Sequence, residues 1–287
     1  LPMSIVFLNG SYMPMSEAKI SPLDRGFLFG DGIYEVIPSY QGSLLGFGPH
    51  IDRMNDGFKG IGLNIDWSHQ QWKTVCEDLA SKNGNSNLGI YLQVSRGADT
   101  KRYHAFPEDV EPTVFGFTFD IPKAPVADKT VAKGYKVSTA EDLRWQRCHI
   151  KSTALLGNVL HFQQGYDQGN DETLLFNANN ELTEASSCNA FIIKDGTLIT
   201  PPLDNQLLPG ITRHMLLDIL RKDGSIPVEE RIVSKQEVIN ADEVWITSST
   251  KEIGAVIEVD GSLIGDGKVG DVWLAAQRLF SAHKFNY

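Results

Sequence analysis

The stretch EDLRWQRCHIKSTALLGNVL, residues 141–160, changes character in its middle, and the rest of the chain is interpreted around that change. A polar run ends at Ile150 and Lys151. Apolar residues then recur at helical spacing: Leu155, Leu156, Val159 and Leu160. We therefore expect a helix with a packed apolar face just after Lys151, and a lysine partly buried at the junction. Burial favours the neutral, nucleophilic amine. A surface lysine beside a helix start is the alternative, and this stretch taken alone favours it.

The composition is that of an ordinary globular protein. The 287 residues are 41% hydrophobic and 22% charged, which suffices for two domains with cores. The net charge of -10 and the lack of a basic run argue against nucleic acid or an anionic membrane as partner, because both require a positive patch. No apolar stretch approaches the roughly 20 residues that cross a bilayer, and no signal segment opens the sequence. We expect a cytoplasmic protein.

Cysteine spacing and turn signals give further expectations. The three cysteines show no metal-binding spacing, so we expect reduced thiols and no metal site. Two prolines within residues 121–130 predict a linker between a first domain, residues 1–120, and a second, residues 131–287. The patterns also predict a hairpin at residues 4–12, strands at 33–40, 87–96 and 113–119, and helices starting near residues 48, 68, 152, 211 and 266.

Residues 144–160, RWQRCHIKSTALLGNVL, resemble the lysine segment of the fold-type IV enzymes that use pyridoxal 5'-phosphate (PLP), the class IV aminotransferases. They are most similar to the D-amino acid aminotransferases of that group, and the similarity continues in the same order along nearly the whole chain. It implies an α/β (α+β) fold of two domains: a small α/β domain and a larger domain with a pseudo-barrel core. PLP is expected in the cleft between them, held by Lys151 as a Schiff base.

The N-terminal half carries the residues that the resemblance assigns to substrate and phosphate. DRGFLFGDGIYE, residues 24–35, is similar to the family's N-terminal signature and implies that Tyr34 and Val36 face the substrate. HIDRM, residues 50–54, implies that Arg53 binds the cofactor phosphate, a task that suits a forked guanidinium. In the loop GADTKRYHAFP, residues 97–107, Arg102 and His104 match an R-x-H pair that binds the substrate carboxylate from the neighbouring subunit of a homodimer. This loop is one residue longer than the family pattern.

The C-terminal half carries the rest of the implied cofactor site. TEASSCNAF, residues 183–191, implies that Glu184 pairs with the protonated pyridine nitrogen of PLP, which lets the ring accept electrons. LLPGITR, residues 207–213, has a Pro-Gly break before a helix. The resemblance implies that Leu208 packs on the cofactor ring and that further residues bind its phosphate: Ile211, Thr212, Ser248 and Ser249.

The resemblance implies a ping-pong transfer of the amino group from a D-amino acid, such as D-alanine or D-glutamate, to 2-oxoglutarate or pyruvate. Lys151 would also move the proton between the substrate and the cofactor as general acid and base. The same fold serves branched-chain L-amino acid aminotransferases, (R)-amine transaminases and aminodeoxychorismate lyase. Pro38, in the strand that leaves Tyr34, points to an atypical pocket. A non-catalytic PLP-binding protein is the alternative from another class, and intact Lys151 and Glu184 argue against it.

Overall fold

The computed structural model describes residues 4–287, and the chain divides into two units. Unit 1 takes the chain up to Lys123 together with Ile150–Leu155 and Tyr287, and unit 2 takes Ala124–His149 and Leu156–Asn286. The first crossing falls within the predicted linker. The sequence did not predict the return of Ile150–Leu155 to unit 1, which places Lys151 with the N-terminal strands.

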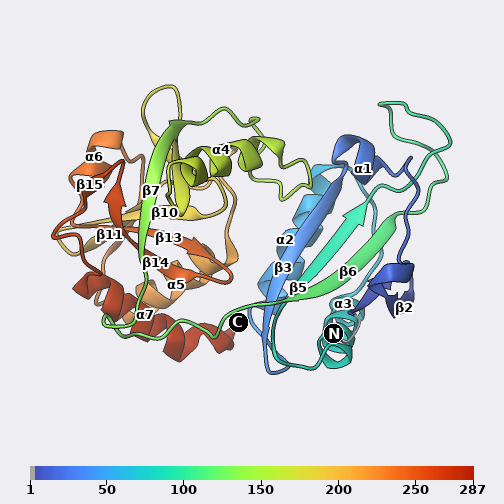
Figure 1. The fold of residues 1–287 in the computed structure, drawn as a ribbon, viewed down its shortest axis with the longest axis horizontal. Coiled ribbons are helices and arrows are strands. Elements are labelled where there is room, and N and C mark those ends of the chain that lie inside the picture. Colours follow the sequence, from blue (N-terminus) through green and yellow to red (C-terminus); the bar gives the residue numbers. More distant parts are fainter. Residues whose placement is uncertain (1–3) are drawn as a thin grey trace. The chain divides into compact units, whose positions relative to one another are not determined.

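Unit 1 is built on a six-stranded antiparallel sheet in the order β2-β1-β6-β5-β3-β4 (Figure 1). Its strands are β1 (Ile5–Leu8), β2 (Ser11–Pro14), β3 (Gly32–Tyr40), β4 (Ser43–Leu44), β5 (Asn87–Ser95) and β6 (Thr113–Asp120). The predicted hairpin is confirmed, because Asn9 and Gly10 turn between β1 and β2 with φ of 47° and 92°.

Helices α2 (Phe47–Gly60) and α3 (His69–Lys82) pack on this sheet, and the core of unit 1 lies between them. Alternate residues of β3 and β5, such as Ile33, Ile37 and Leu92, enter that core. Ser68 caps α3 in a capping box with Gln71, as expected for a helix that starts there. On the opposite face of the sheet, the rings of Tyr34, Tyr91, Phe117 and Phe115 contact one another in turn, and we call this side the aromatic face. The glycine-rich turn of the signature contains the short helix α1 (Arg25–Phe29).

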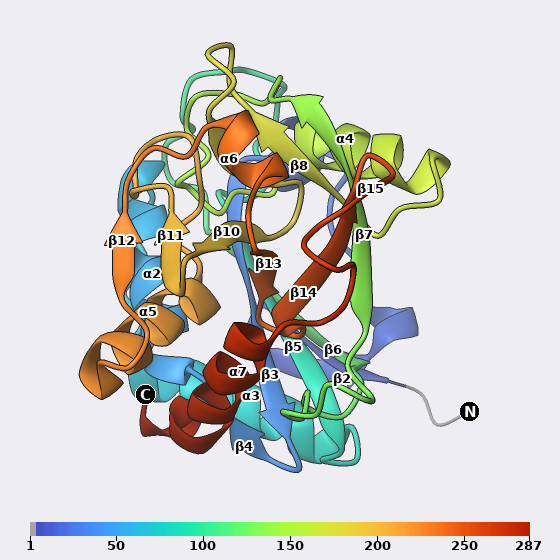
Figure 2. The ribbon, with the colours of Figure 1, turned by 90° about the vertical axis from the view of Figure 1, so that its left-hand side faces the viewer.

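Unit 2 contains a nine-stranded mixed sheet that curls into a half-barrel (Figure 2). Eight strands follow the order β12-β11-β10-β13-β14-β7-β8-β9, and β15 pairs with β14. The bounds are β7 (Gly134–Glu141), β8 (Glu172–Phe176), β9 (Leu182–Ala185), β10 (Asn189–Lys194), β11 (Thr197–Thr200), β12 (Val228–Glu230), β13 (Glu243–Ser248), β14 (Glu252–Val259) and β15 (Ser262–Leu263). The pairs β11–β12, β14–β7 and β7–β8 are parallel. The core of unit 2 contains branched side chains such as Val137, Ile192 and Val244.

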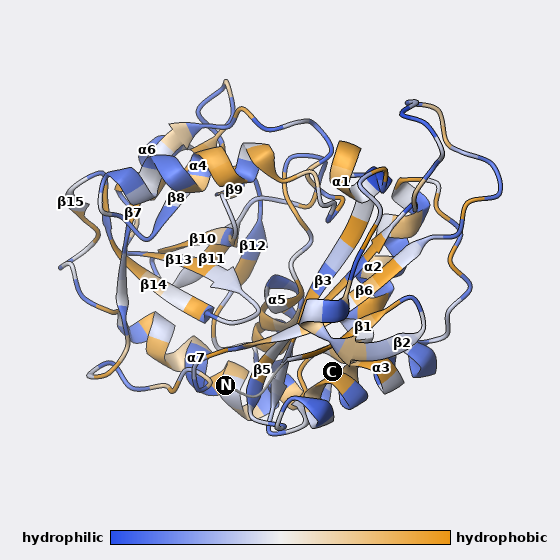
Figure 3. Cartoon of the chain, turned by 45° about the vertical axis from the view of Figure 1, so that its right-hand side comes forward, coloured by the Kyte–Doolittle hydropathy of each residue, from blue (hydrophilic) through white to orange (hydrophobic). Residues whose placement is uncertain are grey.

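The helices of unit 2 are α4 (Leu156–Asp167), α5 (Ile211–Asp223), α6 (Lys235–Ile239) and α7 (Asp271–His283). The predicted helix after Lys151 exists, but the prediction of a packed apolar face on it is wrong. Leu156, Val159 and Leu160 are more than half exposed, and α4 buries His161 and Gly165 instead. Figure 3 shows hydrophobic colour along α4. Helical spacing identified the helix correctly, but it could not indicate whether the apolar face packs against other parts of the same chain.

Candidate active site

Backbone pairing with β3 fixes the segment that carries Lys151. The amide of Tyr34 donates to the carbonyl of Lys151 at 3.2 Å, and the amide of Thr153 donates to the carbonyl of Gly32 at 3.0 Å. This close approach requires a glycine at position 30, which has a φ of 63° and where a Cβ would lie 2.8 Å from the Cα of Ala154. The lysine is therefore held by main-chain bonds on both sides.

The side chain of Lys151 lies against Tyr34. Lys151 Nζ donates to Tyr34 Oη at 3.1 Å and lies 4.2 Å from the centre of its ring. Lys151 is half-buried, as expected. Tyr34 stacks on Tyr91 with ring centres 5.7 Å apart, and burial, aided by Tyr34, raises the pKa of Tyr91 to about 12. Val36 lies two residues further along β3, on the same sheet face as Tyr34. The structure thus brings Lys151 and Tyr34 together on the aromatic face.

Arg53 is held by a buried carboxylate that the sequence did not single out. Its Nε and Nη2 donate to the two oxygens of Glu35 at 2.9 and 2.7 Å, and His50 Nδ1 lies 2.7 Å from Glu35 Oε1. Burial alone would raise the pKa of Glu35, but Arg53 and His50 outweigh it and hold the pKa at about 2. Burial lowers the pKa of His50. Glu35 therefore stays ionised and orients the guanidinium of Arg53.

Glu184 lies in β9 and is buried, so it is not an ordinary surface carboxylate. Arg144 Nη1 donates to its Oε2 at 2.7 Å, and the amide of Leu208 donates to both of its oxygens at 3.2 and 3.3 Å. Burial raises the pKa of Glu184 to about 7, and Arg144 offsets this effect only in part. The carboxyl is thus poised between its two protonation states near neutral pH.

Arg144, which the sequence prediction missed, divides its donors between several acceptors. Its Nε and Nη2 donate to Asp142 at 3.0 and 2.8 Å, and Nη2 also donates to the carbonyl of Gln206 at 3.0 Å. Burial lowers the pKa of Arg144, but Asp142 and Glu184 raise it more. The only sequence signal was the alternation of acid and base at positions 142 and 144 just before the lysine segment.

The expected phosphate residues of unit 2 lie at element ends. Ile211 and Thr212 open α5 and are buried, and Gly210 before them offers no side-chain cap to the first amides of the helix. Asn189 Nδ2 donates to the carbonyl of Leu208 at 2.9 Å and so fixes the turn before α5. Ser248 ends β13, and its hydroxyl accepts from the amide of Lys251. The helix start thus presents backbone donors, which suit an anion.

A second buried acid shapes the loop after β9. Glu172, fully buried, accepts hydrogen bonds from the hydroxyls of Ser186 and Ser187 and from the amide of Ser186. The backbone of residues 184–189 is therefore tied to the centre of the sheet. Ala185 and Cys188 in this loop are both small and buried, which fits this arrangement.

Arg102 and His104 are exposed in the loop of residues 97–107. The structure brings both to Phe29 of α1: the guanidinium carbon of Arg102 lies 5.1 Å from the ring centre, and the ring of His104 lies 5.3 Å from it. The side chains of Arg102 and His104 are therefore displayed on the surface of unit 1, next to Phe29 of α1.

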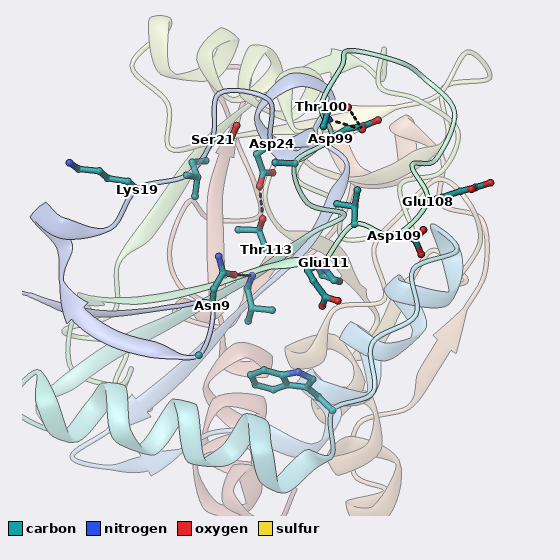
Figure 4. A pocket seen from close by; sticks show the side chains of 17 residues that line it. Asn9, Lys19, Ser21, Asp24, Asp99, Thr100, Glu108, Asp109, Glu111 and Thr113 are labelled. Atoms are coloured by element: carbon teal, nitrogen blue, oxygen red, sulfur yellow. Dashed lines mark hydrogen bonds between the residues drawn. The ribbon is translucent and has the colours of Figure 1, made fainter.

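A hollow of about 970 Å³ is lined in part by Ala98, Asp99 and Thr100 at the start of this loop (Figure 4). It contains five acids, Asp24, Asp99, Glu108, Asp109 and Glu111, and one lysine, Lys19. This lining repels an anionic substrate or phosphate, and it includes neither Lys151 nor Tyr34. Within residues 4–287 no helix is long and apolar enough to span a membrane, and no group of three or more potential metal ligands occurs.

The family model for amino-transferase class IV matches residues 32–259, a range that includes Lys151, Glu184 and most of both units. The chain therefore belongs to the class IV aminotransferases, as the resemblance of its lysine segment implied.

Relatives within this family cover almost the whole chain. A D-alanine aminotransferase of Staphylococcus haemolyticus is 37% identical over 98% of this chain and 98% of its own length, and one of Staphylococcus aureus (strain N315) is 38% identical with the same coverage. A D-alanine aminotransferase of Listeria monocytogenes serotype 1/2a (strain 10403S) is 36% identical over 96% of this chain and 94% of its own length.

Solved structures share the fold. The branched-chain amino acid aminotransferase of Escherichia coli superposes with a TM-score of 0.89 at 23% identity, over 98% of this chain and 95% of its own. The branched-chain amino acid aminotransferase of Thermobaculum terrenum, in its PLP form, gives a TM-score of 0.87 at 18% identity, over 99% of this chain and 94% of its own. The expected fold class is confirmed, and at this identity the likeness concerns the fold alone.

Proposed function

We propose that this chain is a PLP-dependent aminotransferase that moves the amino group of a D-amino acid to a 2-oxo acid. Relatives called D-alanine aminotransferase, 36–38% identical over nearly full length, support the substrate class. The observation that carries the chemistry is Lys151, pinned to β3 by main-chain bonds with its amine 3.1 Å from Tyr34 Oη. A lysine held in this way meets the geometric needs of a nucleophile and proton carrier.

The residues present fit the cofactor. Glu184 is buried, and Arg144 offsets only part of the effect of burial, so its pKa is raised to about 7. A cationic N–H beside it, such as a protonated pyridine nitrogen, would stabilise the ionised carboxylate. PLP, when bound, supplies an aldehyde that takes up the amino group and a ring that accepts the electron pair of the substrate Cα. We assign the phosphate to Arg53, Ile211, Thr212, Ser248 and Ser249, and the ring contact to Leu208.

The chain's own residues then divide the work. Lys151 Nζ removes the proton from the substrate Cα and later returns a proton. Tyr34 Oη accepts a hydrogen bond from that amine and so fixes where the proton is taken. Glu184, when ionised, supplies the negative charge that keeps its partner nitrogen protonated. Tyr34 and Val36 border the substrate, and Arg102 with His104 bind its carboxylate through charge-assisted hydrogen bonds.

We also propose a homodimer in which Arg102 and His104 serve the site of the second subunit. The exposed apolar residues of unit 2 support it: Leu143, Trp145, Leu156, Val159, Leu160 and Tyr166. The amide of Leu143 donates to His161 of α4 at 3.0 Å, which keeps Leu143 beside the helix. Apolar residues gathered in this way mark an interface. The chain should sediment at twice its mass and Leu160→Glu at its single mass; a monomeric wild type contradicts the dimer.

The half-reaction tests the activity. We expect the yellow protein to bleach when mixed with D-alanine, faster than with L-leucine or (R)-1-phenylethylamine. Lys151→Ala should lose this reaction by about a thousandfold, because both nucleophile and proton carrier are removed. Lys268→Ala, on the surface, is the control. Fastest bleaching by L-leucine would overturn the D-amino acid proposal. The expectation of a cytoplasmic location stays a prediction.

A further inference from the structure

Arg25, in the first turn of α1, is a buried arginine that contacts the backbone of the loop of residues 97–107. Its guanidinium donates to three successive backbone carbonyls of that loop: Nη1 to Tyr103 at 2.5 Å, Nη2 to His104 at 3.0 Å and Nη1 to Ala105 at 3.4 Å. Its Nε donates to Asp31 Oδ2 at 2.9 Å, which fixes the plane of the fork. The carbonyls gripped by Arg25 thus include that of His104 itself.

The surroundings of Arg25 extend the grip to the side chains and to the end of the loop. The guanidinium groups of Arg25 and Arg102 both contact the ring of Phe29, at 4.8 and 5.1 Å from its centre. Asp31 also accepts hydrogen bonds from Arg96, whose guanidinium covers the ring of Phe106 at 3.5 Å. The carbonyls of residues 103–105 and the side chains of Arg102, His104 and Phe106 are therefore in contact with α1 or Arg96, while Arg102 and His104 stay exposed.

We propose that Arg25 is a positioning residue: by holding the carbonyls of residues 103–105 it fixes the spacing and direction of Arg102 and His104, and so sets the affinity for the substrate's carboxylate. This inference rests on the proposed function, because it takes the carboxylate as the ligand of Arg102 and His104. An exposed loop that had to be ordered on binding would lose affinity to conformational entropy, and the grip of Arg25 removes that cost in advance. A lysine cannot replace the fork, because it is a point charge without fixed donor directions.

The first test measures the loop without using activity. Lys101 and Arg102 are trypsin sites directly before the gripped carbonyls, so cleavage there reports how often the loop opens. In the purified holoenzyme, Arg25→Met should speed cleavage at these sites about tenfold or more, because hydrogen bonds from a charged donor are lost. Arg25→Lys should cleave nearly as fast although it keeps the charge. Arg278→Met, exposed on α7, should cleave like the wild type.

The second test measures the ligand. For Arg25→Met and Arg25→Lys, KM for D-alanine should rise about tenfold, while kcat falls by a smaller factor. A structural role alone would instead lower the amount of active enzyme, which reduces the apparent kcat and leaves KM unchanged. Thermal melting of each variant shows that it is folded at the assay temperature, and Arg25→Lys retains the ion pair with Asp31 should Arg25→Met fail to fold.

The outcomes separate this inference from the proposed function. Faster cleavage together with a raised KM supports it. Unchanged cleavage in both variants overturns the grip, whatever KM does. If Arg25→Lys keeps the wild-type KM for D-alanine, the forked guanidinium is not required and that part of the inference is wrong. Faster cleavage with an unchanged KM overturns the link to the ligand, and Arg102→Gln then tells which part failed: if that variant also keeps its KM, the carboxylate assignment of the proposed function is wrong.

Discussion

Each unit buries a glutamate beside an arginine, and the two pairs behave in opposite ways. In unit 1 the pKa of Glu35 is held at about 2, and in unit 2 the pKa of Glu184 is raised to about 7. Both carboxyls are buried, so burial raises both pKa values. The difference comes from how the arginines are shared.

Glu35 receives two hydrogen bonds from Arg53 and has a ring nitrogen of His50 beside it. Glu184 receives one bond from Arg144, whose other donors go to Asp142 and the carbonyl of Gln206, and Asp142 itself raises the pKa of Glu184. The first pair keeps Glu35 ionised and fixes the guanidinium of Arg53, the residue that we assign to the phosphate. In the second pair Arg144 does not fully offset burial, so the pKa of Glu184 stays raised. A strongly shifted pKa of this kind is typical of a ligand or active site.

The largest expected effect is on stability, at Glu35. Glu35→Gln should lower the free energy of unfolding by about 3–5 kcal/mol, because it leaves the buried guanidinium of Arg53 without its anion. Urea unfolding measures it, with the exposed Glu77→Gln on α3 as control. The lowered pKa implies that the wild type gains this stability above the unfolded value near 4.5 and loses it as pH falls towards 2. A loss below about 1 kcal/mol would contradict a structural role.

The next effect is on activity, at Glu184. Glu184→Gln should slow the half-reaction with D-alanine by about a hundredfold, because a neutral amide cannot keep a pyridine nitrogen protonated. Its free energy of unfolding without cofactor at pH 8 should change by less than about 1 kcal/mol. The raised pKa means that burial of the ionised form already costs stability as pH rises from 4.5 through 7. Equal losses of stability in Glu184→Gln and Glu35→Gln would remove the contrast between the two pairs.

Sequence patterns could predict most of the elements and the residues of the lysine motif, but not the partners that set their charge. Glu35 is in phase with the core residues Ile33 and Ile37, opposite to Tyr34, and an acid at a core position requires a partner. The sequence therefore indicated that Glu35 has a partner. It did not indicate which basic residue is the partner, because that depends on how α2 packs on the sheet. Arg144, just after β7, meets Glu184 of β9 through the pairing of β7 with β8 and of β8 with β9, which is not local in sequence.

The exposed face of α4 shows a different limit of sequence reasoning. Apolar residues at helical spacing predict burial, and the pattern is the same whether the covering surface belongs to the same chain or to another. Leu156, Val159 and Leu160 are exposed here, so the pattern was correct about the helix and wrong about its partner. The return of Ile150–Leu155 to unit 1 was equally hidden, because it depends on pairing with β3 and on the glycine at position 30.

The smallest expected effect is on the pH dependence of activity, and it tests whether Arg144 acts on Glu184 through its charge. Arg144 lowers the pKa of Glu184 against burial, so Arg144→Met should raise that pKa further. Activity needs the ionised carboxylate, and its acid limb should therefore move about one pH unit upward, which corresponds to about 1.4 kcal/mol. The rate of the D-alanine half-reaction between pH 5.5 and 9 measures the shift, with the exposed Arg147→Met as control. If the limb stays in place while the maximal rate falls, Arg144 acts by holding the geometry of residues 142–151 rather than by charge. The sharing of its donors then does not explain why the pKa of Glu184 is raised.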